Sequence, residues 1–157
     1  MRVTRESVFE YAGGAPAFLR LAQAHHERCL LDPLLNHPFS HPGHPDHVQR
    51  LAWYWGEVLG GPPAYTESSD GQTGMLLLHA GMGAPRDMGD RFVDCFVHAA
   101  DDARLPEDPE FRQVLREYME WAVRAVDEYN PPRSSVPGEL RTPRWSWDGL
   151  QPGGAPA

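Results

Sequence analysis

Apolar residues recur at intervals of three and four positions in four long segments of this chain. That spacing places them on one face of a helix, which is the pattern of a helix packed against a core. The predicted helices are residues 16–30, 47–59, 86–103 and a last one that begins within residues 106–110 and runs to residue 126. No segment shows a convincing strand pattern, so the sequence predicts an all-α fold.

Proline and glycine mark where these helices end. Asp32-Pro33 ends the first helix, because proline has no amide donor and restricts the residue before it. Asp46 is the predicted N-cap of the second helix, and Gly60-Gly61-Pro62 ends that helix. Residues 36–46 contain three prolines and a glycine and are expected to form a loop. Residues 64–83 are expected to hold turns up to residue 71, followed by a short apolar segment.

The composition fits one globular domain. The 157 residues are 41% hydrophobic and 23% charged, which is ordinary for a chain of this size. The net charge of -8 argues against nucleic acid or an anionic membrane surface as the main partner. We expect a cytoplasmic location, because no apolar run could span a bilayer and the N-terminus lacks a secretory pattern. Cys29 and Cys95 lie within helical patterns and are expected to be core thiols.

One histidine ends the apolar stretch that follows these turns. His79 comes directly after the segment Gly74–Leu78. We expect this segment to be buried, and a buried imidazole needs a hydrogen bond or a metal to offset its lost hydration. His47 opens a second amphipathic segment, which is rich in large aromatic residues. Two histidines on two elements, with an apolar wall between them, form the arrangement that a haem iron requires.

Five motifs connect this hypothesis to a known family. In chain order they are Phe9-Glu10-Tyr11-Ala12-Gly13-Gly14, Asp32-Pro33-Leu34-Leu35, Trp53-Tyr54-Trp55, Gly60-Gly61-Pro62 followed by Tyr65, and Leu78-His79. In order and spacing the chain resembles the truncated haemoglobins, in particular group II, whose members carry Gly-Gly-Pro-x-x-Tyr after helix E. The resemblance runs from Ser7 to Tyr129. It implies a truncated globin fold, a two-over-two helical sandwich around a haem.

The resemblance also implies which residues hold the haem. His79 is the proximal ligand of the iron, and Leu78 and Met82 pack on the same side. Phe39 falls where the family places an aromatic residue over the haem. The chain has no Cys-x-x-Cys-His motif for covalent attachment, so the expected cofactor is haem b, iron protoporphyrin IX.

On the opposite, distal face the resemblance points to histidines. Counting back from Gly60-Gly61-Pro62 puts His47 at the distal position of helix E, with Leu51 one turn further on the same side. His26 stands where group members commonly have a tyrosine that donates to the ligand, and Phe92 stands where they usually have a tryptophan. The predicted distal donors are therefore imidazoles. Two further residues assigned to this pocket are Tyr54 and Trp55.

The implied function is that of a haem-binding globin that binds O2 reversibly, together with CO and NO. Members of the family are also described as NO dioxygenases or peroxidase-like enzymes, and the residues do not separate these activities. An enzyme of that kind needs an external reductase, because this chain has no Gly-x-Gly-x-x-Gly motif for a flavin or nicotinamide. A homodimer is compatible with the sequence.

Two alternative functions, which would place the chain in other classes of protein, stay open. His37, His41, His44 and His47 are closely spaced in the predicted loop and could bind zinc or nickel, although structural zinc sites usually include cysteine. A haem-free helical scaffold is the other alternative, and the colour of the purified protein separates it from a haem protein.

The composition changes after the last predicted helix. We expect a globin domain at residues 1–130 and an extension rich in proline and glycine at residues 131–157, outside the resemblance. Trp145 and Trp147 lie in this extension. Large apolar side chains are costly to expose, so we expect the segment around them to pack on this globule or on a neighbouring one.

Overall fold

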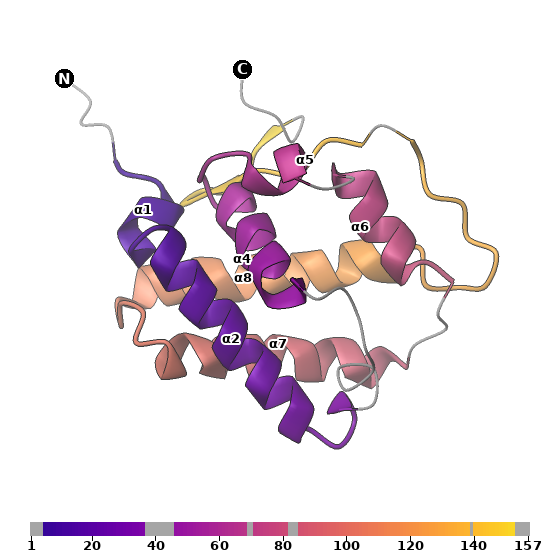
Figure 1. Ribbon diagram of the computed structural model, residues 1–157, viewed down its shortest axis with the longest axis horizontal. Helices are drawn as coiled ribbons and strands as arrows, with labels where there is room; N and C mark the ends of the chain where they lie inside the picture. The colour runs from indigo at the N-terminus through magenta and orange to yellow at the C-terminus, as the bar shows by residue number, and fades with distance from the viewer. Residues whose placement is uncertain (1–4, 37–45, 69–70, 82–84, 139, 153–157) are drawn as a thin grey trace.

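The computed structural model describes residues 5–36, 46–68, 71–81, 85–138 and 140–152. Its helices in chain order are α1 (Val8–Ala12), α2 (Ala15–Leu31), α4 (His47–Val58), α5 (Ala64–Ser68), α6 (Gly71–His79), α7 (Arg86–Asp102) and α8 (Pro109–Asp127). Two short strands follow, β1 (Trp145–Ser146) and β2 (Gly149–Leu150) (Figure 1). The all-α prediction is confirmed.

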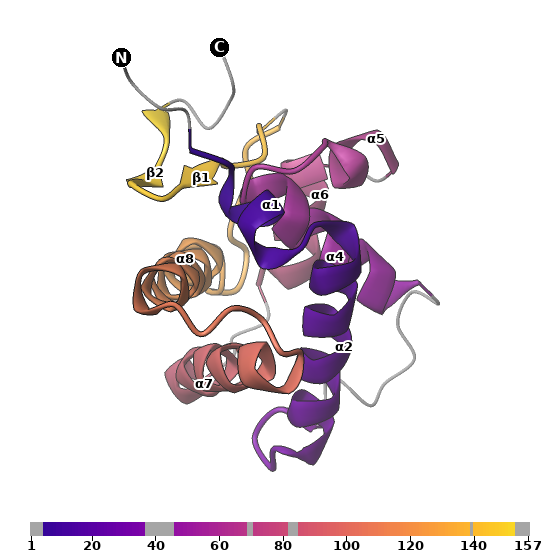
Figure 2. The same ribbon diagram turned by 90° about the vertical axis from the view of Figure 1, so that its left-hand side faces the viewer.

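Two pairs of helices form the body of the protein. α2 packs against α4, α7 packs against α8, and α2 also contacts α7 where the two pairs meet. Figure 2 shows α7 and α8 nearly end-on, one above the other, beside the layer that contains α2 and α4. This is the two-over-two arrangement that the family resemblance implied.

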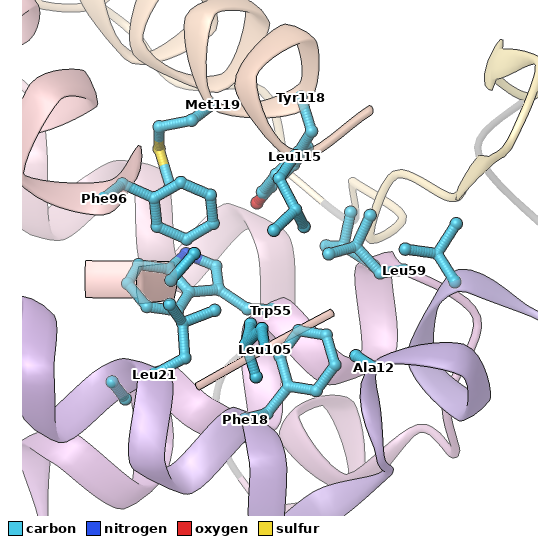
Figure 3. Close-up of a cluster of buried hydrophobic side chains, with 14 of the residues drawn as sticks. Ala12, Phe18, Leu21, Trp55, Leu59, Phe96, Leu105, Leu115, Tyr118 and Met119 are labelled. Carbon is cyan, nitrogen blue, oxygen red and sulfur yellow. The ribbon is translucent and has the colours of Figure 1, made fainter. Parts of the chain in front are cut away.

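Apolar side chains from both layers meet in one core (Figure 3). Phe18 and Leu21 from α2, Trp55 from α4 and Tyr118 from α8 are all buried in it. Phe96 of α7 packs edge-on against Trp55, with ring centroids 4.8 Å apart. Because each large apolar side chain contributes about 1.5–3 kcal/mol when it is fully buried, this core holds the two layers together.

The Gly60-Gly61 pair allows α1 to approach the end of α4. Gly60 has φ of 107°, in the region that favours glycine. A Cβ atom on Gly61 would lie 2.7 Å from the carbonyl oxygen of Gly56 and 2.7 Å from the Phe9 ring. The amide of Phe9 donates to the carbonyl of Leu59 at 2.9 Å, directly at this approach. Side chains larger than hydrogen would force the two helices apart here.

α5 forms where the sequence predicted turns, so that prediction was wrong for residues 66–68. The buried Glu57 at the end of α4 supports this short helix. Its carboxylate accepts the amide N–H of Thr66 at 2.9 Å and also the Thr66 hydroxyl. The contact satisfies a donor near the start of α5, which would otherwise lack an intrahelical partner. Local sequence patterns do not reveal this contact, because Glu57 and Thr66 are nine residues apart in the chain.

The extension forms a β-hairpin, which corrects the prediction that the chain has no strands. β1 and β2 pair antiparallel, with Trp145 opposite Leu150 and Ser146 opposite Gly149. Gly149 follows the two-residue connection and has φ of 105°. Strands of two residues are too short to show an alternating pattern in the sequence.

Trp145 and Trp147 lie against the helical body. Trp145 is buried, and its ring centroid lies 5.8 Å from that of Tyr118 and 5.9 Å from that of Trp121, both on α8. The Trp147 Nε1–H group donates to the carbonyl of Glu6 at 2.8 Å. The hairpin is therefore packed on α8 and beside α1, as Figure 2 shows.

Replacing Trp145 by alanine is expected to lower the free energy of unfolding by about 3 kcal/mol, because a buried aromatic side chain is lost. Leu150→Ala is the matched control, since Leu150 pairs with Trp145 across the hairpin but is 45% exposed. We expect it to change stability by less than about 0.5 kcal/mol. Urea denaturation of the full chain measures both variants. If Trp145→Ala lowers the free energy of unfolding as little as Leu150→Ala does, the packed position of the hairpin is contradicted.

Candidate functional site

α6 orients the ring of His79, its last residue. The Nδ1 atom of His79 lies 2.8 Å from the carbonyl oxygen of Met75, one turn earlier. Because a carbonyl oxygen can only accept, Nδ1 carries the proton and Nε2 keeps its lone pair. A neutral imidazole whose other nitrogen donates to a backbone carbonyl is the usual form of a metal-ligating histidine. In this tautomer Nε2 of His79 carries a lone pair that could coordinate a metal.

The side chain of His79 is exposed, whereas the sequence predicted that its whole segment is buried. That prediction was correct for Leu76, which is 4% exposed, and wrong for His79. The polypeptide packs on α6 at Gln72 and Leu76, and His79 ends the helix beyond them. The rest of the described chain therefore does not enclose the His79 side chain.

The contact between α2 and α4 brings two of the predicted distal residues together. The ring centroids of His26 on α2 and His47 at the start of α4 lie 5.7 Å apart, with the planes tilted by 60°. His26 is half-buried and His47 is exposed. Leu51, one turn along α4, is partly buried against the core. Two imidazoles and an apolar side chain therefore share one end of α4.

His25, next to His26 in the sequence, has a different environment. It is fully buried, and its Nε2 atom lies 3.4 Å from the carbonyl oxygen of Phe92. Its ring packs edge-on against Phe92 and Trp55, with centroids 4.3 and 5.2 Å away. Burial lowers the pKa of His25 to about 3, against a partly opposing hydrogen bond to Phe92. The imidazole is therefore neutral at physiological pH and acts as a core side chain.

This burial predicts a specific dependence of stability on pH. Below pH 6.5 the unfolded chain protonates His25 while the folded chain does not, so the free energy of unfolding falls as pH falls toward the folded-state pKa of about 3. Between pH 7 and pH 5 this loss amounts to about 2 kcal/mol. We expect His25→Phe to remove that part of the loss, which urea denaturation at the two pH values measures. An unchanged pH dependence in the variant would contradict a buried, neutral His25.

Tyr54 and Trp55, both predicted for the distal pocket, are buried. The Tyr54 hydroxyl donates to Oε1 of Gln72 at 2.6 Å, and burial raises the pKa of that hydroxyl. Trp55 packs in the core between His25 and Phe96. The Tyr54–Gln72 bond connects α4, which carries His47, to α6, which carries His79. Gln72 and the Met75 carbonyl could not be recognised as site groups from local sequence patterns. Only the spacing of four residues from Met75 to His79 could have indicated the Met75 carbonyl.

The helical arrangement and these side chains match a known family of proteins. The sequence model of the family described as bacterial-like globin matches residues 7–128 of the chain. The chain belongs to the bacterial-like globin family. The protein is thus a haem-binding globin, and globins bind diatomic gases such as O2.

Solved haemoglobin structures resemble this globin over most of its length. The thermostable haemoglobin of the actinobacterium Thermobifida fusca is 28% identical, with a TM-score of 0.65, over 82% of this chain and 100% of that one. The group II truncated haemoglobin of Bacillus anthracis is 20% identical, with a TM-score of 0.69, over 88% of this chain and 100% of that one. The truncated oxygen-avid haemoglobin of Bacillus subtilis is 23% identical, with a TM-score of 0.64, over 77% and 98% of the two chains. The fold is that of the group II truncated haemoglobins. Among curated proteins, none has a sequence that matches this chain.

Several predicted site residues of the globin lie outside the described part. The residues outside the described ranges include Phe39 and Met82. They also include three histidines of the alternative zinc or nickel loop, namely His37, His41 and His44. Leu78 lies within α6, but its side chain is not described. Elsewhere in the chain, the described residues contain no group of three or more histidine, cysteine, aspartate or glutamate side chains that could hold a metal ion.

Cys29 and Cys95 of the globin are free and buried, as predicted, and burial raises the pKa of both thiols.

Within the described ranges of the globin, no helix combines the length and apolar character needed to cross a membrane.

Proposed function

We propose that this globin binds O2 reversibly, and CO and NO as well, at a b-type haem whose iron is ligated by Nε2 of His79. The observation that carries the proposal is the 2.8 Å hydrogen bond from His79 Nδ1 to the Met75 carbonyl. It fixes the tautomer in which Nε2 offers a lone pair to a metal. The haem, when bound, supplies the iron at which a diatomic gas binds.

The donor set of the chain fits this cofactor. A non-covalent haem needs one strong axial ligand and an apolar environment with few polar contacts. His79 is the ligand, and the half-buried side chains of Leu51 and Phe92 are apolar contacts available from α4 and α7. Phe39, Leu78 and Met82 complete the proposed set of haem contacts.

His47 and His26 are the proposed hydrogen-bond donors to the gas. Their rings lie close together, 5.7 Å apart between centroids, at the start of α4. A ring N–H can donate to a ligand that gains negative charge, as O2 does, and such a charge-assisted hydrogen bond contributes about 1.5–3 kcal/mol. CO remains nearly apolar and gains much less from a donor. The pair therefore favours retention of O2 over CO.

Reversible binding is tested by adding and removing O2 while the visible spectrum is recorded. The reduced, haem-loaded protein should change its visible spectrum on exposure to O2 and return to the starting spectrum when O2 is removed. Conversion to the oxidised protein in a single cycle would contradict a reversible binder. Rapid consumption of added NO by the O2-loaded protein, with turnover when a reductase is supplied, would instead favour the NO dioxygenase alternative.

The proposed location and partners of the globin rest on the sequence alone. A cytoplasmic location, an external reductase and a homodimer stay predictions. The acidic net charge of -8 supports the expectation that neither nucleic acid nor an anionic membrane surface is a main partner.

A further inference from the structure

α6, the helix that ends at His79, has limited packing of its own. Its closest helical neighbour is the short α5. Gln72 and Leu76 are buried, and Met75 is partly buried against the core. A helix of nine residues is not stable in isolation. Contacts from other parts of the chain must therefore hold α6 in place.

The chain after α8 supplies such contacts at both ends of α6. The Thr73 hydroxyl donates to the carbonyl of Pro137 at 3.1 Å and accepts the amide N–H of Leu140 at 2.9 Å. One hydroxyl can do both, because it carries a donor and two lone pairs. Beyond the other end, the amide of Gly81 donates to the carbonyl of Tyr129 at 2.7 Å. The two attachments lie on either side of His79 in the sequence.

The same segment is fixed to α4 and α5 a few residues later. The hydroxyl oxygens of Thr142 and Thr66 lie 3.1 Å apart, at the position where Thr66 also bonds to Glu57. The Arg144 guanidinium donates through Nη1 to the carbonyl of Glu57 at 2.9 Å and to that of Gly61 at 3.2 Å. The Glu57 carbonyl lies in the last turn of α4, where carbonyls lack an i+4 amide partner, and the Gly61 carbonyl lies just after that helix.

The segment then ends in the hairpin on α8. Trp145 is buried and packs against Tyr118 and Trp121. The Arg5 guanidinium lies 3.4 Å from the centroid of the Trp147 ring, over its face. Figure 1 shows the path: the chain leaves α8, turns round the outer side of α6 and crosses to the strands. Because both of its ends are anchored on the helical core, the segment can hold α6 against that core.

We propose that residues 137–138 and 140–145 form a strap that positions α6 and thereby His79, with Thr73 as the positioning residue. This inference rests on the proposed role of His79 as the iron ligand. The orientation of a ligating histidine is set by the groups that hold it. Through Met75 the imidazole is fixed to α6, and through Thr73 α6 is fixed to the strap. Loss of the Thr73 contacts should change the orientation of the His79 imidazole at the iron without breaking the bond between His79 and the iron.

The test compares Thr73→Val with Thr73→Ser in the full-length, haem-loaded protein. Valine keeps the shape but removes both hydrogen bonds, whereas serine keeps the hydroxyl. We expect Thr73→Val to accelerate haem transfer to excess apomyoglobin roughly three- to tenfold, and Thr73→Ser to restore the parent rate. In the reduced protein, the iron–histidine stretching band in the resonance Raman spectrum should shift or broaden in Thr73→Val but not in Thr73→Ser.

Ser134→Ala is the matched control within the extension. Its hydroxyl donates to the nearby carbonyl of Pro131 at 2.6 Å rather than to α6, so both readouts should match the parent. A Thr73→Val protein with the parent's haem transfer rate and Raman band would overturn the strap. A lower melting temperature with an unchanged Raman band would overturn it too, because Thr73 would then act on stability alone.

His79→Gly, measured in parallel, separates this inference from the proposed function. If His79→Gly loses the iron–histidine band while Thr73→Val keeps the parent's band, the strap fails and the proposed ligand stands. If His79→Gly keeps the parent's band, the proposed ligand fails, and the strap, which rests on it, fails with it.

Discussion

Replacing His79 by alanine is expected to abolish stable haem retention. The substitution removes the proximal bond to the iron, and apolar contacts alone hold a haem weakly. Even the groups that merely orient a ligating histidine contribute ten- to hundredfold to metal affinity, so loss of the ligand itself should exceed roughly a hundredfold. The measurement is the amount of haem per chain that survives desalting, read from the ratio of haem to protein absorbance.

His98→Ala is the matched control for this substitution. His98 is also an exposed histidine on a helix, α7, and has no proposed role in the site. It should retain one haem per chain with the parent's spectrum. For His79→Gly, added imidazole should restore haem binding, because the free base can occupy the place of the lost side chain. A His79→Ala protein with stoichiometric haem and the parent's spectrum would show that another residue ligates the iron.

His47→Leu is expected to accelerate O2 dissociation from the reduced protein by roughly ten- to hundredfold. The reason is the loss of a charge-assisted hydrogen bond of about 1.5–3 kcal/mol. CO dissociation should change far less, since bound CO carries little charge. The two rates are measured by rapid mixing with a competing ligand. His26→Leu should give the same pattern with a smaller effect, because we assign His26 the second donor position.

His47→Gln is the control that keeps an N–H donor at this position. Its O2 dissociation rate should lie closer to that of the parent than to that of His47→Leu. If His47→Leu accelerates O2 and CO equally, His47 controls access to the pocket by its size rather than by a hydrogen bond. If neither rate changes, His47 does not reach the gas, and the proposed distal assignment is wrong.

The long helices could be predicted from the sequence because their packing is encoded in local periodicity. α2 spans Ala15–Leu31 and stops at Asp32-Pro33, and α7 spans Arg86–Asp102, each within one residue of the prediction at both ends. In both, apolar residues three and four positions apart face the core. α5 was missed because its support comes from Glu57 on α4, which lies nine residues before the Thr66 that it binds.

The histidines of the site were found by different routes. The register of the family motifs selected His26 and His47, and the structure brings their rings together. His79 was selected from its apolar segment and the same register, but its exposure was not foreseen, because periodicity does not show where packing on a short helix stops. His25 lies four residues after Leu21 and four before Cys29, so periodicity places it on the buried face of α2, but periodicity does not show which distant residues surround the imidazole there.

The two tryptophans of the extension predicted a segment packed on a globule, and in the structure both lie against the helical body. The positions that this segment contacts could not be predicted, because its hydrogen bonds connect residues far apart in the chain, as those from Thr73 to Pro137 and Leu140 do. Such pairings carry no local signal, because a single threonine in a helix looks the same with or without a distant partner.

The most direct test of the central claim is the absorption spectrum of the purified, haem-supplied protein in its reduced form, before and after CO is added. Our account predicts about one non-covalent haem per chain and a strong haem band that shifts when CO binds. A protein that remains colourless after haem is supplied, or a haem band that does not respond to CO, would contradict a gas-binding globin.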